Sequence, residues 1–468
     1  MDNDNDIYFS KTGYALNHQK GEIIAALMVT AGAALLALAP STLLSILALL
    51  VMVAGLALRP GLGLPLLALS LPFYLFPKQL GGMAFSMPEL ILVANLMGAF
   101  FFAIHQRWNG CKQPLSNLST HLDMPIALFL VAALLSLLAS EVLRVSLRDL
   151  RTLILEPIAA FYLAAWFLRD RRDISRLLFA LLLGGFAAAG LGLYQYLFTD
   201  HVVAVEGAKR MLGPYLSPNH LGLYMGRTIP IALALGLFVP RLRLVAALSV
   251  GLLAVALGLT FSVGAWLATL LAVCVITLLW KKRAILVLAA AVAALSVAAL
   301  PLLSIERVSS HFSITRGTSF IRLHLWQSSL QMVRDHPLLG VGMDNFLYHY
   351  RGSYIMEEAV AEPNLSHPHN IVLNFWLQMG VLGIIATGWL LVALARSWLH
   401  LWRAASQSMD RALLAGIAGA MVDFLAHGMV DNSYFLVDMA FHFWLLAGML
   451  VAIEKCSQRL LSPSAQIG

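Results

Sequence analysis

The chain has 468 residues, of which 60% are hydrophobic and only 12% carry a charged side chain. Because soluble domains carry about a quarter charged residues, this composition excludes an ordinary soluble globular protein and indicates one embedded in a membrane. The formal net charge is +7, but in a membrane protein the placement of Lys and Arg along the chain is more informative than their sum.

Apolar runs recur along the whole chain, and each is long enough or nearly so to cross a hydrocarbon core of about 30 Å. We expect roughly fourteen spans. Twelve or thirteen also fit, because the shortest run could be re-entrant and residues 244–280 are interrupted only by Ser262, Val263 and Gly264. The expected spans cover residues 22–39, 42–58, 62–76, 89–105, 124–140, 152–168, 177–198, 219–239, 244–262, 264–280, 284–303, 369–395, 412–430 and 434–453. The predicted fold is therefore an all-α polytopic membrane protein with about 12–14 transmembrane helices.

The ends of the chain are expected to be cytoplasmic tails, residues 1–21 and 454–468. The first is polar and acidic, which does not resemble a cleavable signal peptide. With the N-terminus inside, the inside segments hold 19 Lys and Arg residues against 11 outside, as the positive-inside rule requires. The three cysteines, Cys111, Cys274 and Cys456, lie far apart in the sequence, so neither a disulfide framework nor a cysteine metal site is expected.

The longest loop, residues 304–368, separates the N-terminal spans (22–303) from the C-terminal spans (369–453) and is predicted to lie on the outer face. It is the segment large enough to form a small subdomain. Residues 319–333 have the pattern of an amphipathic helix, which Asp335-His336-Pro337 should end. A tight turn over residues 338–342 and an aromatic stretch follow. Because the loop is amphipathic and aromatic, we expect it to lie on the membrane surface.

The segment Ser366-His367-Pro368-His369-Asn370 lies where this loop meets an apolar run. Because a proline disfavours helix at the residue before it, the helix should begin at or just after His369, at the boundary between water and bilayer. A titratable imidazole there is a candidate for acid–base chemistry, and a purely structural histidine is the equal alternative. Asn370 could hold this imidazole or cap the helix. Further on, Gly380 and Gly383 should share one helix face that a second helix or a lipid chain can approach.

Two arginines at the predicted outer boundary, Arg210 and Arg322, are candidates for binding phosphate oxygens, since the guanidinium group suits bidentate contacts. The alternative is that they contact lipid headgroups or nearby carboxylates. His367 and His369 could share a metal ion, but a zinc site needs three or four clustered ligands, and no HExxH or CxxC partner accompanies them. We therefore expect no metal.

Several ionisable residues fall within or at the edges of the expected spans. Such groups are functional candidates by default, and pairing within the bundle is the equal alternative. They are Glu156, Arg227, Asp423, Asp431 and Asp438.

The pattern His369-Asn370, nine residues, Gly380, two residues, Gly383 resembles the signature of bacterial O-antigen ligases and the related Wzy-type polymerases. Residues 322–326 and 335–342 resemble the segment that leads into this signature, and Ser217-Pro218-Asn219 resembles the start of an earlier span. The likeness covers about residues 205–385, and the many spans with one large periplasmic loop agree with it.

This resemblance implies a GT-C-like, metal-independent glycosyltransferase without a cofactor, in the bacterial inner membrane, with its active site facing the periplasm. Its donor would be a glycan on undecaprenyl diphosphate, moved en bloc to a hydroxyl of lipid A-core or of another glycan. His369 would be the general base, Asn370 would support it, and Arg322 and Arg210 would bind the diphosphate. Attack by the hydroxyl in one displacement would invert the anomeric carbon. Membrane lipids are expected around the chain, and nucleic acid is not a partner.

Other functions remain open at this stage. A Wzy-type polysaccharide polymerase or a protein O-oligosaccharyltransferase would use the same chemistry on another acceptor. A polytopic transporter or flippase could line a path with the intramembrane charges, although the sequence lacks the two repeated halves with broken helices typical of that class.

Overall fold

The computed structural model describes residues 4–110, 119–205, 207–286, 288–290, 317–360 and 362–461. Most of these residues are helical, and two short antiparallel hairpins are the sheet among them. The α-helices are α1 (Asp4–Leu38), α2 (Thr42–Leu58), α3 (Gly63–Ser70), α4 (Met87–Trp108), α5 (Asp123–Ser136), α6 (Leu143–Asp149), α7 (Glu156–Phe167), α8 (Arg171–Phe198), α9 (Pro218–Phe238), α10 (Arg243–Leu259), α11 (Val263–Trp280), α14 (Gly317–Asp335), α15 (Phe346–His349), α16 (Ile371–Ala404), α17 (Ser408–Gly428) and α18 (Val437–Leu461). The strands are β1 (Lys78–Leu80), β2 (Met83–Phe85), β3 (Val202–Val205) and β4 (Ala208–Met211).

The length and hydropathy of these helices confirm a polytopic all-α membrane protein. Within the described residues, nine helices are long and apolar enough to cross a membrane, and three shorter apolar segments cover Thr42–Leu58, Pro60–Phe73 and Asp123–Ala139. Most expected spans coincide with a helix to within a few residues. The span expected at 284–303, the loop residues 304–316 and Cys111 lie largely or wholly outside the described residues.

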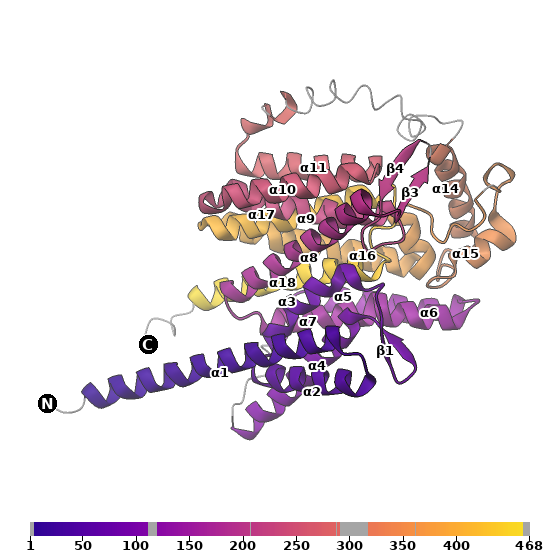
Figure 1. The fold of residues 1–468 in the computed structure, drawn as a ribbon. Coiled ribbons are helices and arrows are strands. Elements are labelled where there is room, and N and C mark those ends of the chain that lie inside the picture. The colour runs from indigo at the N-terminus through magenta and orange to yellow at the C-terminus, as the bar shows by residue number, and fades with distance from the viewer. Residues whose placement is uncertain are drawn as a thin grey trace.

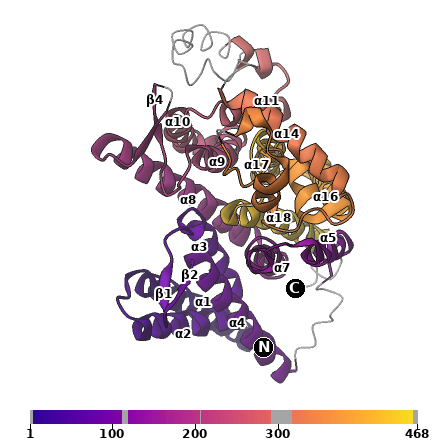
Figure 2. The ribbon, with the colours of Figure 1, turned by 90° about the vertical axis from the view of Figure 1, so that its right-hand side faces the viewer.

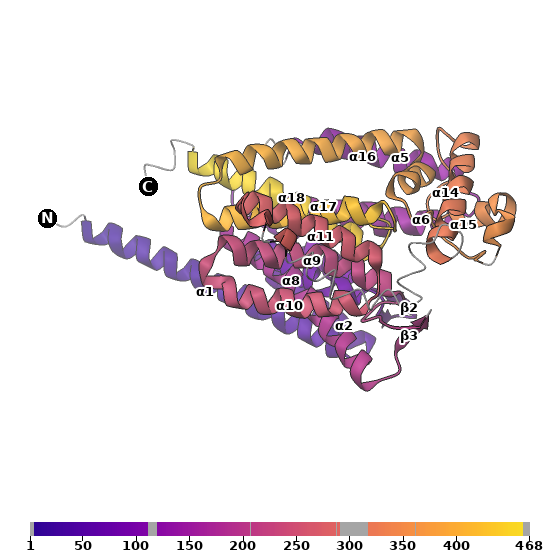
Figure 3. The same cartoon turned by 90° about the horizontal axis from the view of Figure 1, so that it is seen from above.

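The helices lie side by side, with both chain termini at one end of the bundle and the two hairpins, α14 and α15 at the other (Figure 1). Seen end-on, α1 to α4 form a group beside the larger group that contains α8 to α11 and α16 to α18 (Figure 2). From above, α16, α17 and α18 run alongside one another (Figure 3). The end that carries α14 and α15 therefore lies opposite the termini.

Helix α18 forms the centre of the bundle, where its residues from Met439 to Ile453 are almost all buried. Trp444 packs edge-to-face on Phe129 and Phe161, and its indole N–H donates to the hydroxyl of Tyr434 (2.9 Å), which in turn donates to the carbonyl of Leu153 (3.1 Å). Because lipid tails are as apolar as these side chains, close packing and such hydrogen bonds hold the helices together.

Two helices start earlier than expected. Helix α1 begins at Asp4, so the chain expected to form a tail over residues 1–21 is helical from that residue. The span expected at 152–168 begins at Leu143 and contains a π-helical segment, Leu150–Leu155, just before Pro157. Proline has no N–H to donate to the preceding turn, and a wide turn accommodates it within a continuous helix.

The loop before α16 follows the prediction for its amphipathic helix, since α14 ends at Asp335. The chain then turns through Gly340 and Gly342, whose φ angles of 69° and 88° suit glycine. This turn packs on α16, where the amide of Val341 donates to the carbonyl of Leu377 (2.8 Å).

Helix α16 is interrupted at Gly380, so the expectation of one unbroken glycine face is wrong there. Gly380 has φ 64° and ψ −167°, a conformation that is almost restricted to glycine. A Cβ at this position would lie 2.0 Å from the carbonyl oxygen of Leu338, and the next amide, of Val381, donates to the carbonyl of Pro337 (3.1 Å). The close approach that Gly380 permits is therefore by the loop backbone rather than by a second helix or a lipid chain.

Candidate active site

The segment 366–370 is fixed at both sides of His369. The indole of Trp326, on α14, donates to the carbonyl of Pro368 (2.9 Å). Asn370 caps α16: its Oδ1 accepts from the amides of Val372 (3.0 Å) and Leu373 (3.1 Å), and its Nδ2 donates to the carbonyl of Met429 (3.2 Å). Of the two roles predicted for Asn370, the structure thus shows helix capping.

Between these anchors, His369 adopts a left-handed backbone conformation, with φ at 49°. This region is uncommon for residues other than glycine, and a side chain persists in it only where the surroundings impose it. The indole contact before His369 and the cap after it supply that constraint. The backbone therefore aims the imidazole toward the turn between α17 and α18.

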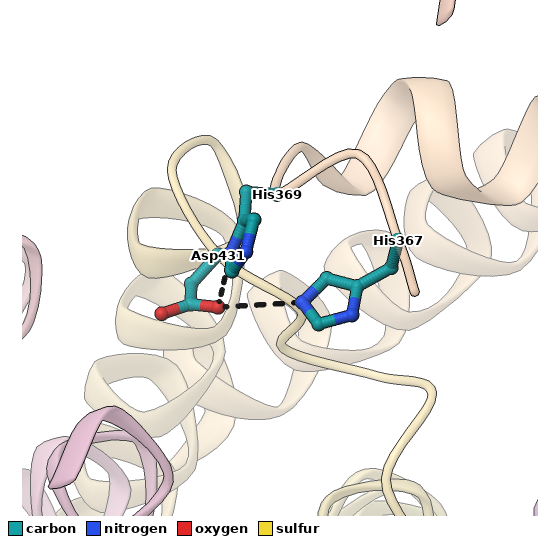
Figure 4. Close-up of side chains that lie close together, drawn as sticks. All are labelled: His367, His369 and Asp431. Carbon is teal, nitrogen blue, oxygen red and sulfur yellow. Dashed lines mark hydrogen bonds and ion pairs between the residues drawn. The ribbon is translucent and has the colours of Figure 1, made fainter. Parts of the chain in front are cut away.

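The residue that receives His369 is Asp431, from that turn. The Nδ1 atom of His369 lies 2.9 Å from Oδ1 of Asp431, and the same oxygen accepts from the amide of Asn432 (2.8 Å) (Figure 4). A carboxylate can only accept, so Nδ1 carries the hydrogen and Nε2 keeps a lone pair. Because 18% of the His369 side chain is exposed, against 7% for Asp431, the histidine is accessible and the carboxylate is sheltered. This arrangement orients a base.

His367 lies on the other side of the same carboxylate. Its Nε2 is 3.8 Å from Oδ1 of Asp431, and its ring centroid is 4.2 Å from that of His369. Burial, the neighbouring imidazole and the charge of Arg322 lower the pKa of His367, against the opposing effect of Asp431. For Asp431, burial raises the pKa, but the two histidines more than offset it and hold the pKa well below its ordinary value. A charged Asp431 carboxylate beside a neutral His367 imidazole is the state expected near neutral pH.

The two predicted arginines occupy different places. Arg322 lies on α14, near enough to His367 for its charge to influence that imidazole. Arg210 lies on β4, where its Nε donates to the carbonyl of Thr260 (2.7 Å) and its Nη2 to Oδ1 of Asn219 (2.8 Å). Arg322 therefore belongs to the neighbourhood of the histidines, and Arg210 is tied to the start of α9.

A cavity of about 410 Å³ adjoins His367. His367 and Asn432 are in its wall, together with Arg148, Asp344 and Gln378. It opens a space for a polar ligand beside His367, whose ring centroid is 4.2 Å from that of the candidate base His369.

The same side chains have ligand atoms that a metal ion could use. One atom each from His367, His369 and Asp431 lie within 4.8 Å of one another. The sequence offered two of these ligands, and the third comes from a residue 62 positions away from His369. In the structure the hydrogen bond between His369 and Asp431 joins two of the three, and the absence of a metal stays a prediction.

Asp431 is the residue that sequence reasoning did not assign to the site. It was recognised only as one of several ionisable residues at the edge of a span, and no short motif connects it to His369. Its one signal in the sequence is its position at the end of an apolar run, next to a turn. That Asp431 reaches the N-terminus of α16 is visible only in the folded bundle.

The bundle and this site define the chain as a multi-pass membrane protein with a histidine–aspartate pair at the N-terminus of one of its long apolar helices. Residues 248–388 match the family model described as O-antigen ligase, and the matched segment contains Arg322, His369, Gly380 and Gly383. This match supports the resemblance to the O-antigen ligase and Wzy superfamily that the sequence motifs indicate. No curated protein matches the chain.

Proposed function

We propose that the chain is an inverting, metal-independent glycosyltransferase of the O-antigen ligase type. It moves a glycan en bloc from undecaprenyl diphosphate to an acceptor hydroxyl at the periplasmic face of the inner membrane. The family supports membrane glycosyl transfer of the O-antigen ligase or polymerase type in general. The single observation that carries the finer proposal is the hydrogen bond of 2.9 Å between His369 and Asp431.

His369 acts as the general base. A sugar hydroxyl is a poor nucleophile at neutral pH, so a lone pair on Nε2 that takes its proton during attack contributes about 10²–10⁴-fold to the rate. Asp431 holds the ring in the required tautomer and stabilises the imidazolium that forms. The pairing of a partly exposed imidazole with a sheltered carboxylate supports these roles.

The acceptor oxygen attacks the anomeric carbon as the bond from that carbon to the diphosphate breaks. The electron pair of the broken bond stays on the diphosphate oxygen, and the proton of the hydroxyl passes to His369. Cationic side chains stabilise the growing negative charge. Arg322 is assigned the main part, since it is close enough to His367 for its charge to influence that imidazole. Arg210, on β4, is assigned a smaller share in stabilising this charge.

The position of the site at one end of the bundle supports a lipid-linked donor. A prenyl chain stays in the bilayer while its diphosphate lies at the boundary with water, and His369 immediately precedes the membrane helix α16. That end lies opposite the termini (Figure 1). With the termini in the cytoplasm, as the Lys and Arg distribution predicts, the site faces the periplasm.

The acceptor distinguishes the ligase from its relatives. A polysaccharide polymerase transfers to a glycan that is itself lipid-linked, and a protein O-oligosaccharyltransferase transfers to a Ser or Thr hydroxyl. The same base and the same leaving group serve all three reactions. Lipid A-core is the acceptor we assign.

The decisive experiment measures transfer of a lipid-linked glycan in membranes that contain wild-type protein, His369→Ala or Arg322→Ala. We expect His369→Ala to lose about 10²–10⁴-fold in rate and Arg322→Ala to lose activity as well. His201→Ala is the matched control, because His201 is an exposed histidine in a loop, and it should transfer normally. Normal transfer by a well-expressed His369→Ala protein would remove the mechanism.

Two further assays test the finer points. Transfer should survive washing with a chelator; loss that added zinc restores would make His367, His369 and Asp431 a metal centre instead. A donor of defined stereochemistry should give a product with the opposite anomeric configuration, and a product that keeps the configuration would contradict single displacement.

A further inference from the structure

The cavity beside His367 has walls from parts of the chain that are far apart in sequence. Helix α6 contributes Arg148 and Asp149, the loop before α15 contributes Asp344, and α16 contributes Gln378. The turn that holds Asp431 contributes Asn432. Its volume of about 410 Å³ lies in the range of about 300–1,000 Å³ that small-molecule sites occupy, which is room for about one or two sugar rings.

The walls are tied to one another before any ligand binds. Oε1 of Gln378 accepts from the amide of Asp344 (2.7 Å). Nδ2 of Asn374 donates to Oδ1 of Asn432 (3.1 Å), which connects α16 to the turn before α18. Asn345 accepts from the amide of Val142 (2.7 Å) and so connects the loop to α6. A site that is held by its own hydrogen bonds costs little ordering when a ligand enters.

The charges in this wall do not suit a phosphate. Arg148 donates from Nε to Oδ1 of Asp149 (3.1 Å) and from Nη2 to Oδ2 of Asp344 (2.5 Å), so two carboxylates share one guanidinium. An anion would meet one excess negative charge here. Carboxylates and amides are instead good partners for hydroxyl groups, which both donate and accept.

The cavity and Arg322 are separate parts of the site. Arg322 is not in the cavity wall, whereas His367, which its charge influences, is. In a single displacement the attacking oxygen and the leaving oxygen are on opposite sides of the anomeric carbon. If the diphosphate binds at Arg322, the cavity is left for the attacking sugar.

We propose that this cavity is the acceptor subsite, and that it binds an uncharged sugar unit whose attacking hydroxyl lies at His369. The inference rests on the proposed glycosyl transfer and adds the chemical class of the acceptor. Asp344 and Asp149 accept hydrogen bonds from the sugar hydroxyls, while Arg148 keeps the two carboxylates in place.

The test is the kinetics of Asp344→Asn in membranes, with the acceptor and the lipid-linked donor varied separately. Asn keeps the shape of the side chain and weakens one charge-assisted hydrogen bond, so the KM for the acceptor should rise about tenfold. The KM for the donor should stay within about twofold. Glu358→Gln, at an exposed acid elsewhere in the same loop, is the matched control and should leave both constants unchanged.

A competition assay gives a second readout. Neutral methyl glycosides should inhibit transfer competitively with the acceptor, the corresponding 6-phosphates should not, and Asp344→Asn should weaken the inhibition. Competition with the donor instead, a rise in the donor KM alone, or an unchanged acceptor KM would each overturn the subsite. Failure of the proposed function is a separate result, since it would appear as normal transfer by His369→Ala.

Discussion

Two aspartates that are seven residues apart in the sequence, Asp431 before α18 and Asp438 in its first turn, each pair with a histidine. The two pairs have the same chemistry and differ in how accessible the imidazole is. Asp431 pairs with His369 at 2.9 Å and Asp438 pairs with His220 at 2.8 Å. Asp438 is fully buried and also accepts from the hydroxyl of Tyr215 (2.8 Å), whose ring stacks on His220 with centroids 4.0 Å apart.

The pair of His220 and Asp438 is shielded from solvent. Only 8% of the His220 side chain is exposed, against 18% for His369. A histidine–aspartate pair therefore indicates catalysis only where a reactant can reach the imidazole. Elsewhere the same pair joins two helices, here α9 and α18.

The largest effect should separate the two aspartates by activity. Asp431→Asn keeps the size of the side chain but removes the charge that stabilises an imidazolium, so transfer should fall by about 10²–10⁴-fold with the fold intact. Asp438→Asn should keep its activity per folded molecule and lose about 1–3 kcal/mol of stability, because buried donors lose a charged acceptor. Rates and thermal unfolding of both variants, measured side by side, check this. Equal loss of activity in the two would mean that the comparison is wrong.

The next effect concerns Arg227, which supports the buried region around the second pair. Arg227 is 1% exposed, and its guanidinium donates to the carbonyls of Met439 (2.8 Å) and Ser433 and lies over the ring of Phe424. Arg227→Met removes the buried donor that these two carbonyls share, so we expect a loss of about 2–5 kcal/mol in stability.

Thermal unfolding of the purified protein measures the loss, and transfer per folded molecule should be unchanged. Arg241→Met, at an exposed arginine in the short connection after α9, is the control and should unfold like the wild type. A stable Arg227→Met protein that has lost transfer would place Arg227 in the catalytic site instead.

A smaller effect tests how the accessible pair is positioned. Gly380→Ala forces a side chain into a left-handed conformation against the carbonyl of Leu338, and we expect it to cost about 2–4 kcal/mol. Gly388 lies in the same helix with open space around its Cβ position, so Gly388→Ala should be neutral or stabilise by up to about 1 kcal/mol. Unfolding midpoints decide, and equal midpoints for the two variants would show that the break in α16 is not a constraint.

The sequence predicted the spans well because hydrophobicity alone determines them. The run expected at 264–280 is α11, Val263–Trp280, and the helix expected just after His369 begins at Ile371. The break at Gly380 could not be predicted in this way. It depends on the loop backbone around Leu338, which reaches α16 only in the folded structure.

Half of the candidate site was predictable for a similar reason. His369 and Asn370 lie next to each other in a motif, and the position of Pro368 indicates where the helix starts. Asp431 and Asp438 looked alike in the sequence, both acidic and both at the edge of an apolar run. Only the three-dimensional contacts assign the first to an accessible imidazole and the second to a buried one.

The smallest effect is on the pH dependence of stability, and it comes from His367. Burial, first of all, and the charge of Arg322 lower its pKa in the folded protein, so below about pH 6.5 the unfolded chain binds a proton that the folded chain resists. Stability therefore falls as the pH decreases through that value. Asp431 does not change the stability in this pH range. Its pKa is lowered in the folded protein, so the stability it contributes is lost only at a pH below the ordinary pKa of an aspartate.

Unfolding midpoints from pH 7.5 to 5.0 should fall less steeply in His367→Gln than in the wild type, while His201→Gln keeps the wild-type slope. An unchanged slope in His367→Gln would show that the imidazole takes up its proton as easily in the folded site as in water.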